Sequence, residues 1–178
     1  MNVNDQYLKV VIERLKSVKE LGDKTIGQLD EDGLHWTFND ATNSIATIVK
    51  HMRGNMISRW TDIFTTDGEK ADRQRDSEFE DDLNTRKEIL EAWHDGWARL
   101  FRTLNGLSGD DVLKPIKIHG KEYTVMEAIE GQMSHYSAHV GQMIYAGKQI
   151  KGEDWQVLSI PKGQSEDYLK EMFEKEEE

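Results

Sequence analysis

The chain has 178 residues and no cysteine, which excludes disulfides, thiolate metal ligands and a cysteine nucleophile. Its formal net charge of −11, without a dense Lys/Arg stripe, argues against duplex DNA or RNA as a partner. No apolar run approaches the ~20 residues that span a bilayer, and the first residues lack the features of a secretory signal. We therefore expect one cytoplasmic domain over residues 1–178, without a nucleic-acid or membrane partner.

Two segments in the first third of the chain carry apolar residues at helical spacing. The first predicts a helix over about residues 4–29, stopped by the polar residues 30–33. The second predicts a helix that begins after Asn43 or Ser44, either of which is a suitable N-cap, and continues to Phe64. Both helices would bury one face against the rest of the domain.

The middle of the chain alternates between charged and apolar segments. Residues 68–82 are charged and nearly free of large apolar side chains, so we expect a long solvated loop there. Residues 84–105 again show helical spacing, and Gly106 ends that helix. Residues 112–123 alternate around His119-Gly120, which is typical of a small β-hairpin.

A fourth long helix follows the hairpin. Thr124 and Glu127 form the sequence pattern of a capping box, and the helix stops near Gly152. Residues 153–163 look extended, and a short last helix is expected over about residues 165–175. The predicted fold is an all-α antiparallel four-helix bundle, with a β-hairpin in the crossover before helix four and a short C-terminal helix.

Two histidines four residues apart, His135 and His139, are the most informative motif. On a helix this spacing places both rings about one turn apart on the same side, where they can ligate one ion. Their stripe of the helix carries small or neutral residues and no Lys or Glu, which leaves room for a ligand. These neighbours are Ala128, Gly131, Gln132, Gln142 and Ala146. The alternative is a pair of structural histidines on a polar or core face.

His51 lies in a similar setting on helix two and would supply a third ligand from a facing helix. Three histidines leave a position open for water or substrate, whereas structural zinc sites usually have four protein ligands. Asn55 and Gln142, one turn beyond metal-facing histidines, are candidates to line a substrate pocket. The other three histidines, His35, His94 and His119, are interpreted as boundary or solvent-facing residues.

The three-histidine pattern and the order of elements between its members resemble the DinB-like superfamily of four-helix metalloproteins, which includes the YfiT-like metal-dependent hydrolases. The motif of helix four reads HYSAH. The chain is most similar to an uncharacterised subgroup, and the similarity covers essentially its whole length. The segments that carry it are residues 43–45, 48–52, 55–56, 58–62, 65–70, Arg73, 75–76, 78–80, Trp155 and 158–165.

This resemblance implies one divalent transition metal, Zn²⁺ or Ni²⁺, held by His51, His135 and His139, and often a homodimer. It also implies a small-molecule substrate and a thiol-dependent transferase or isomerase activity, with a low-molecular-weight thiol such as bacillithiol as cosubstrate. No motif in the chain itself fixes that thiol.

Three functions remain open from the sequence. The first is a transferase that activates a thiol, and the second is a hydrolase that activates water. The third is a non-catalytic, stress-related metal-binding or scaffold bundle. HYSAH lacks the glutamate of an HExxH metallopeptidase, which argues against peptide hydrolysis. Tyr136, Ser137 or a carboxylate behind the ligands are candidates to assist. Arg59, Arg73 and Arg75 are interpreted as a solvated ion-pair network.

Overall fold

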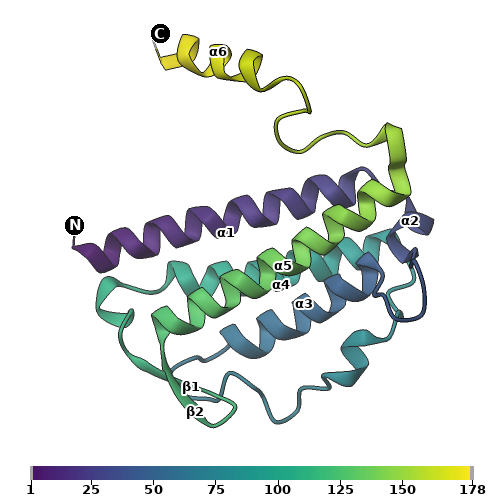
Figure 1. Ribbon diagram of the computed structural model, residues 1–178. Helices are drawn as coiled ribbons and strands as arrows, with labels where there is room; N and C mark the ends of the chain where they lie inside the picture. Colours follow the sequence, from purple (N-terminus) through teal and green to yellow (C-terminus); the bar gives the residue numbers. More distant parts are fainter. Residues whose placement is uncertain (1, 177–178) are drawn as a thin grey trace.

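A computed structural model describes residues 2–176 and confirms a helical bundle with a hairpin before its last long helix (Figure 1). The long helices are α1 (Val3–Gly27), α3 (Ile45–Trp60), α4 (Arg86–Asn105) and α5 (Val125–Lys151). The hairpin consists of β1 (Pro115–Ile118) and β2 (Lys121–Thr124). Shorter elements are α2 (Glu31–His35), α6 (Ser165–Glu176) and the 3₁₀ turns η1 (Asp76–Phe79), η2 (Gly109–Asp111) and η3 (Gly152–Asp154).

The four long helices do not simply alternate in direction. In Figure 1, α1 and α5 run one way along the bundle, whereas α3 and α4 both run the opposite way. Because α3 ends at one end of the bundle and α4 begins at the other, their connection must return along the whole bundle. Residues 61–85 make this return, and η1 packs against α3 on the way.

This path corrects the expectation of a solvated loop over residues 68–82. The Glu78 side chain is only 8% exposed and that of Arg73 only 6%, because the connection lies against α3. The charged composition of the segment misled the interpretation, since several of its charges pair with one another inside the protein. The buried Arg73 and Glu78 side chains of this segment therefore belong to the packed structure and do not face solvent.

Two helix boundaries also differ from the prediction. The second long helix ends at Trp60, because Asp62 takes a left-handed backbone conformation with φ of +49°. Ile63 is nonetheless buried, so its apolar character reflects packing of the turn after the helix. Residues 31–35, expected only to stop the first helix, form the short helix α2, whose N-cap Asp30 accepts a hydrogen bond from the Gly33 amide.

The predicted start of the last long helix is confirmed. Thr124 and Glu127 form a reciprocal capping box at the N-terminus of α5. The hairpin before it turns at His119 and Gly120, both of which have positive φ. The core beneath α5 includes the fully buried side chains of Trp60, Trp97 and Tyr136. Among the described residues, no helix is long and apolar enough to cross a membrane.

Candidate metal centre

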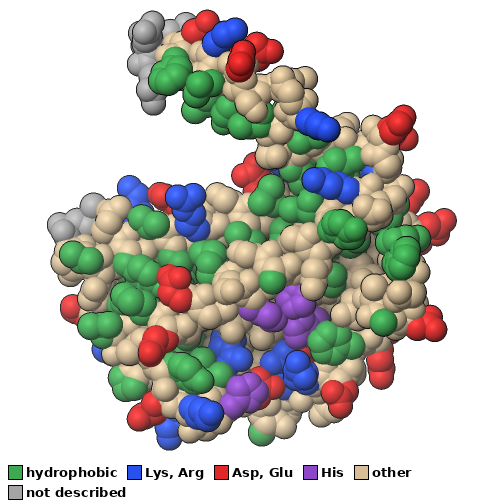
Figure 2. Space-filling view, in the orientation of Figure 1, with side chains coloured by type: hydrophobic (Ala, Val, Ile, Leu, Met, Phe, Trp, Pro, Cys, Tyr) green, Lys and Arg blue, Asp and Glu red, His purple; other side chains and the backbone are tan. Residues whose placement is uncertain are grey.

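Three histidines from two helices meet on one side of the bundle. His51 projects from α3 and is buried, while His135 and His139 project from α5 and are half-buried. The Nε2 atom of His135 lies 3.3 Å from Nε2 of His51 and 3.0 Å from Nε2 of His139. Figure 2 shows histidine side chains reaching the surface in a hollow of the face shown, near basic and hydrophobic side chains.

Hydrogen bonds on the outer side of two rings fix their tautomers. Nδ1 of His51 lies 3.0 Å from a carboxylate oxygen of Glu78, and Nδ1 of His139 lies 3.0 Å from the amide oxygen of Gln142. Both oxygens accept hydrogen bonds, so each Nδ1 carries the hydrogen and donates it. The Nε2 lone pairs of both rings are therefore directed toward His135.

This geometry fits a metal ion better than it fits a hydrogen-bonded cluster. Metal–nitrogen bonds of about 2.0–2.1 Å place neighbouring ligands of a tetrahedral ion about 3.3 Å apart. One hydrogen on His135 Nε2 could satisfy only one of the two lone pairs that face it. Burial and the neighbouring His139 and His51 lower the pKa of His135 to about 4, which keeps its ring neutral near neutral pH. A neutral imidazole is the form that ligates metals.

The carboxylate behind His51 is held in a buried ion pair. Arg73 donates from Nε and Nη2 to the two oxygens of Glu78, both at 2.7 Å. Burial alone would raise the pKa of Glu78, but the hydrogen bonds from His51 and Arg73 outweigh it and lower that pKa. Glu78 therefore stays ionised, and a carboxylate that accepts from a ligand histidine fixes its orientation and increases its basicity.

Glu78 reaches His51 because α3 carries a glycine at the point of contact. A Cβ added to Gly54, one turn after His51, would overlap the Glu78 carboxylate. Phe79, which follows Glu78, stacks on the His51 ring with 4.6 Å between centroids. Glycine 54 thus allows the returning connection to approach the helix closely enough to support one ligand.

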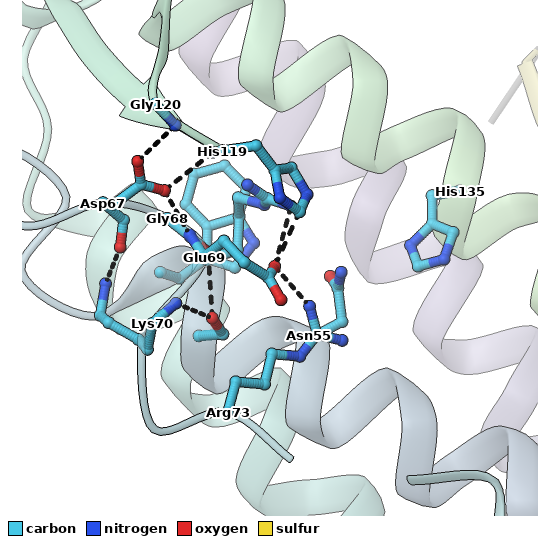
Figure 3. A network of polar contacts seen from close by, with 12 residues as sticks. Asn55, Asp67, Gly68, Glu69, Lys70, Arg73, His119, Gly120 and His135 are labelled. Atoms are coloured by element: carbon cyan, nitrogen blue, oxygen red, sulfur yellow. Dashed lines mark hydrogen bonds and ion pairs between the residues drawn. The ribbon is translucent and has the colours of Figure 1, made fainter. Parts of the chain in front are cut away.

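The same connection ties the hairpin to the metal centre (Figure 3). Arg73 also donates to Glu69 at 2.8 Å, and the exposed His119 ring lies 3.7 Å from the same carboxylate. Asp67 accepts from the backbone amides of His119 and Gly120 at 2.9 and 2.7 Å. A chain of polar contacts therefore runs from the hairpin turn to His51.

The buried arginines correct the interpretation of a solvated network. Arg73 belongs to the buried pairs described above, and Arg59 is 5% exposed. The contact of Arg59 with Glu69 is long, at 4.0 Å, and burial lowers the pKa of its guanidinium. Arg75, by contrast, is exposed and lies over the ring of Phe79.

Asn55 and Gln142, the two candidates to line a substrate pocket, lie in different environments. Asn55 is buried and accepts a hydrogen bond from the Tyr136 hydroxyl at 2.9 Å, and the same hydroxyl accepts from the Trp60 indole. Burial raises the pKa of Tyr136, so its hydroxyl remains protonated near neutral pH. Gln142 lies at the surface beside His139. That Asn55 and Gln142 contact a substrate stays a prediction.

Of the other histidines, His119 is exposed, as expected for a solvent-facing residue, and His94, which was interpreted as a boundary residue, is exposed as well. His35 donates from Nδ1 to a carboxylate oxygen of Asp81 at 2.9 Å and is partly buried. Sequence reasoning missed Glu78, Gly54 and the role of Arg73. The connection carries several acidic residues that could supply a carboxylate acceptor, but sequence spacing did not single out Glu78 among them.

The fold and the cluster define a class: a helical bundle whose two facing helices bring three histidine nitrogens to one point. The family follows from comparison with known sequences. The chain belongs to a family described as protein of unknown function (DUF1572), whose model matches residues 2–164. No curated protein and no solved structure matches the chain significantly.

Proposed function

We propose that the chain is a metal-dependent enzyme of the DinB-like superfamily that holds one divalent transition ion, Zn²⁺ or Ni²⁺. His51, His135 and His139 would be its protein ligands. The observation that carries this proposal is the pair of Nε2 lone pairs, on His51 and His139, directed at a third imidazole 3.3 and 3.0 Å away. A cation at their meeting point accounts for an arrangement that hydrogen bonding alone satisfies only in part.

The donor set favours catalysis over a purely structural role. Three histidines leave a four-coordinate ion one position for an exchangeable ligand, as in catalytic zinc sites. An ion in such a site lowers the pKa of a bound thiol or water, which supplies a nucleophile near neutral pH. Because the chain has no cysteine, a thiol must come from solution. We infer that the reaction is transfer of a low-molecular-weight thiol, of the bacillithiol type, to an electrophilic small molecule.

The side chains around the histidines would tune this site. Glu78 keeps Nδ1 of His51 protonated and makes the ring a stronger donor, and Arg73 keeps the carboxylate ionised and in place. Gln142 performs the orienting role for His139. The supports lie on two different elements, so both histidines are oriented independently of an ion. We also propose a homodimer, on the resemblance alone.

Hydrolysis is the second candidate, because the same three-nitrogen site could activate water. Within residues 2–176, Glu78 is the one carboxylate that is hydrogen-bonded to any of the three histidines, and it is engaged by Arg73 and His51. It is therefore poorly placed to act as a free general base. A thiol, with an ordinary pKa of about 8.5, loses its proton far more readily than water, whose pKa is about 15.7, and this favours transfer over hydrolysis.

The first experiment measures metal content. Tag-free protein, the His51→Ala/His139→Ala variant and a His94→Ala control are dialysed against a mild chelator and examined by elemental analysis. We expect about one equivalent in the parent and in the control, where the exposed His94 is replaced, and little in the double variant. Absence of metal from all three, with failed reconstitution by Zn²⁺ and Ni²⁺, would refute the site.

The second experiment separates the two reactions. Metal-loaded protein is offered 1-chloro-2,4-dinitrobenzene with bacillithiol, mycothiol, glutathione or cysteine, and 4-nitrophenyl acetate without thiol. Thiol-dependent loss of the chloroarene that disappears in the double variant supports transfer. Ester turnover without thiol, lost in the same variant, supports hydrolysis. Absence of both with metal bound favours a non-catalytic bundle.

A further inference from the structure

A cleft of about 680 Å³ opens beside the metal centre, between residues 36–43 and the second half of α5. Its volume lies in the range that holds small-molecule ligands. Three aromatic side chains on its walls remain accessible to solvent: Trp36 at 37%, Phe38 at 77% and Tyr145 at 68% exposed. Trp36 and Phe38 form an edge-to-face pair with 6.5 Å between centroids. Exposed aromatic groups gathered on a concave surface are typical of a binding site.

The chemistry of the lining limits what this cleft can bind. None of its lining residues is charged, although charged residues make up 32% of the chain. The polar groups are hydroxyls and amides, such as Thr42, Asn43 and Gln149, which can donate or accept hydrogen bonds but cannot neutralise a charge. Transfer of an ionised group into such surroundings is unfavourable. The matching ligand is uncharged and largely apolar.

One wall of the cleft adjoins the candidate metal centre, although the three histidines themselves do not line it. Gln142 lines the cleft and also holds His139 through the 3.0 Å contact with Nδ1. Ala138, next to His139, and Ile48, one turn before His51, lie on the same wall. A ligand in the cleft would therefore lie against Gln142, which orients His139, and beside the turn of α3 that precedes His51.

We propose that this cleft binds the uncharged aromatic or hydrocarbon body of the electrophilic substrate and presents its reactive end to the histidine cluster. The role as a substrate site rests on the proposed function, whereas binding of an uncharged aromatic molecule does not. The cleft thereby assigns a substrate class: a hydrophobic electrophile without a charged group in the part that the cleft encloses.

Glycine 141 gives a direct way to fill the cleft. It lies on the cleft wall, on the exposed side of α5, and a Cβ added there meets no atom within 4 Å. Leucine also favours a helix more than glycine does, so Gly141→Leu should fold normally while its side chain enters the cleft. Gly27 is a matched control, since it is exposed at the end of α1, also meets nothing within 4 Å, and lies outside the cleft and away from the histidine stripe.

The probe is N-phenyl-1-naphthylamine, an uncharged aromatic dye whose fluorescence rises in apolar sites. We expect saturable binding of one dye per cleft in the parent and in Gly27→Leu, and at least tenfold weaker binding in Gly141→Leu. The anionic analogue 8-anilino-1-naphthalenesulfonate, with a similar ring system, should bind the parent at least tenfold more weakly. All variants should retain the metal content of the parent.

Two results would overturn the proposal. Equal dye affinity in Gly141→Leu and the parent would show that the dye does not bind in this cleft. Equal affinity of the parent for the charged and uncharged dyes would show that the lining does not select against charge. Neither result depends on the metal, so failure of the cleft remains distinguishable from failure of the metal site.

Discussion

The two sides of the histidine cluster are supported in different ways. On the α5 side, His139 is oriented by Gln142, a neutral and exposed amide three residues away on the same helix. On the α3 side, His51 is oriented by Glu78, a buried carboxylate paired with Arg73 and supplied by a distant connection. A charged acceptor in a buried site makes a stronger hydrogen bond than a neutral acceptor in water. We therefore expect substitutions on the α3 side to reduce metal affinity more than substitutions on the α5 side.

Removal of the buried carboxylate should have the largest effect. Glu78→Ala leaves Arg73 with only Glu69 as its partner and leaves His51 Nδ1 without an acceptor. We expect a loss of about 3 kcal/mol in the free energy of unfolding, measured in urea. Metal affinity should fall by about 10–100-fold in a chelator competition. Glu80→Ala, which replaces an exposed neighbour, should change neither quantity. Parent-like metal affinity in Glu78→Ala would contradict the assigned role.

Gly54→Ala should weaken the same side without removing any polar group. The added Cβ overlaps the Glu78 carboxylate, so Glu78 must move away from His51. We expect about tenfold weaker metal binding, although alanine in a helix normally stabilises by about 0.8–1 kcal/mol over glycine. Gly131→Ala, where a Cβ meets open space, should show that stabilisation with unchanged metal affinity. A gain of stability with full metal affinity in Gly54→Ala would mean that Glu78 adapts without cost.

Gln142→Leu tests the α5 side. The substitution removes the acceptor of His139 Nδ1, but that nitrogen can donate to water because Gln142 is exposed. We expect metal affinity to fall by less than about tenfold, below the effect of Glu78→Ala. Isothermal titration with Zn²⁺ measures both variants under one set of conditions. An equal loss of metal affinity in Gln142→Leu and Glu78→Ala would contradict the expected difference between the two sides.

Asp67→Asn should have the smallest effect, because Asp67 lies beyond Glu69 and Arg73 from the metal centre. The hydrogen bond from the Glu69 amide lowers the pKa of Asp67 most; burial opposes it, and the Gly120 and His119 amides lower the pKa further, so that the net shift is downward. A lowered pKa contributes stability above pH ~3.8 that is lost as the pH falls through the folded-state pKa. The variant should therefore be less stable by under about 1 kcal/mol at pH 7. That difference should shrink in acid unfolding, and metal affinity should be unchanged.

Local patterns predicted much of the fold and half of the candidate site. Helical spacing and capping signals located the long helices, and the HYSAH spacing placed His135 and His139 on one face. His51 was predicted from its similar setting on helix two and only together with the other two histidines, because one histidine on a helix has no local signature. Glu78 could not be found from spacing, since its contact with His51 depends on the direction of α3 and α4. The cleft likewise joins residues 36–43 to α5, two segments without a shared local pattern.

Because α3 and α4 run in the same direction, the connection between them can fold into place after the helices have packed. The helices can pack their apolar faces before residues 64–82 of the connection are in place, because that stretch contributes no side chain to the hydrophobic core. Glu78 belongs to this connection. In the proposed metal site, folding of the connection against α3 and the affinity for the ion would therefore be thermodynamically linked. Limited proteolysis can measure this linkage. Removal of metal should speed cleavage within residues 61–85 while the helices stay intact, and added metal should slow it.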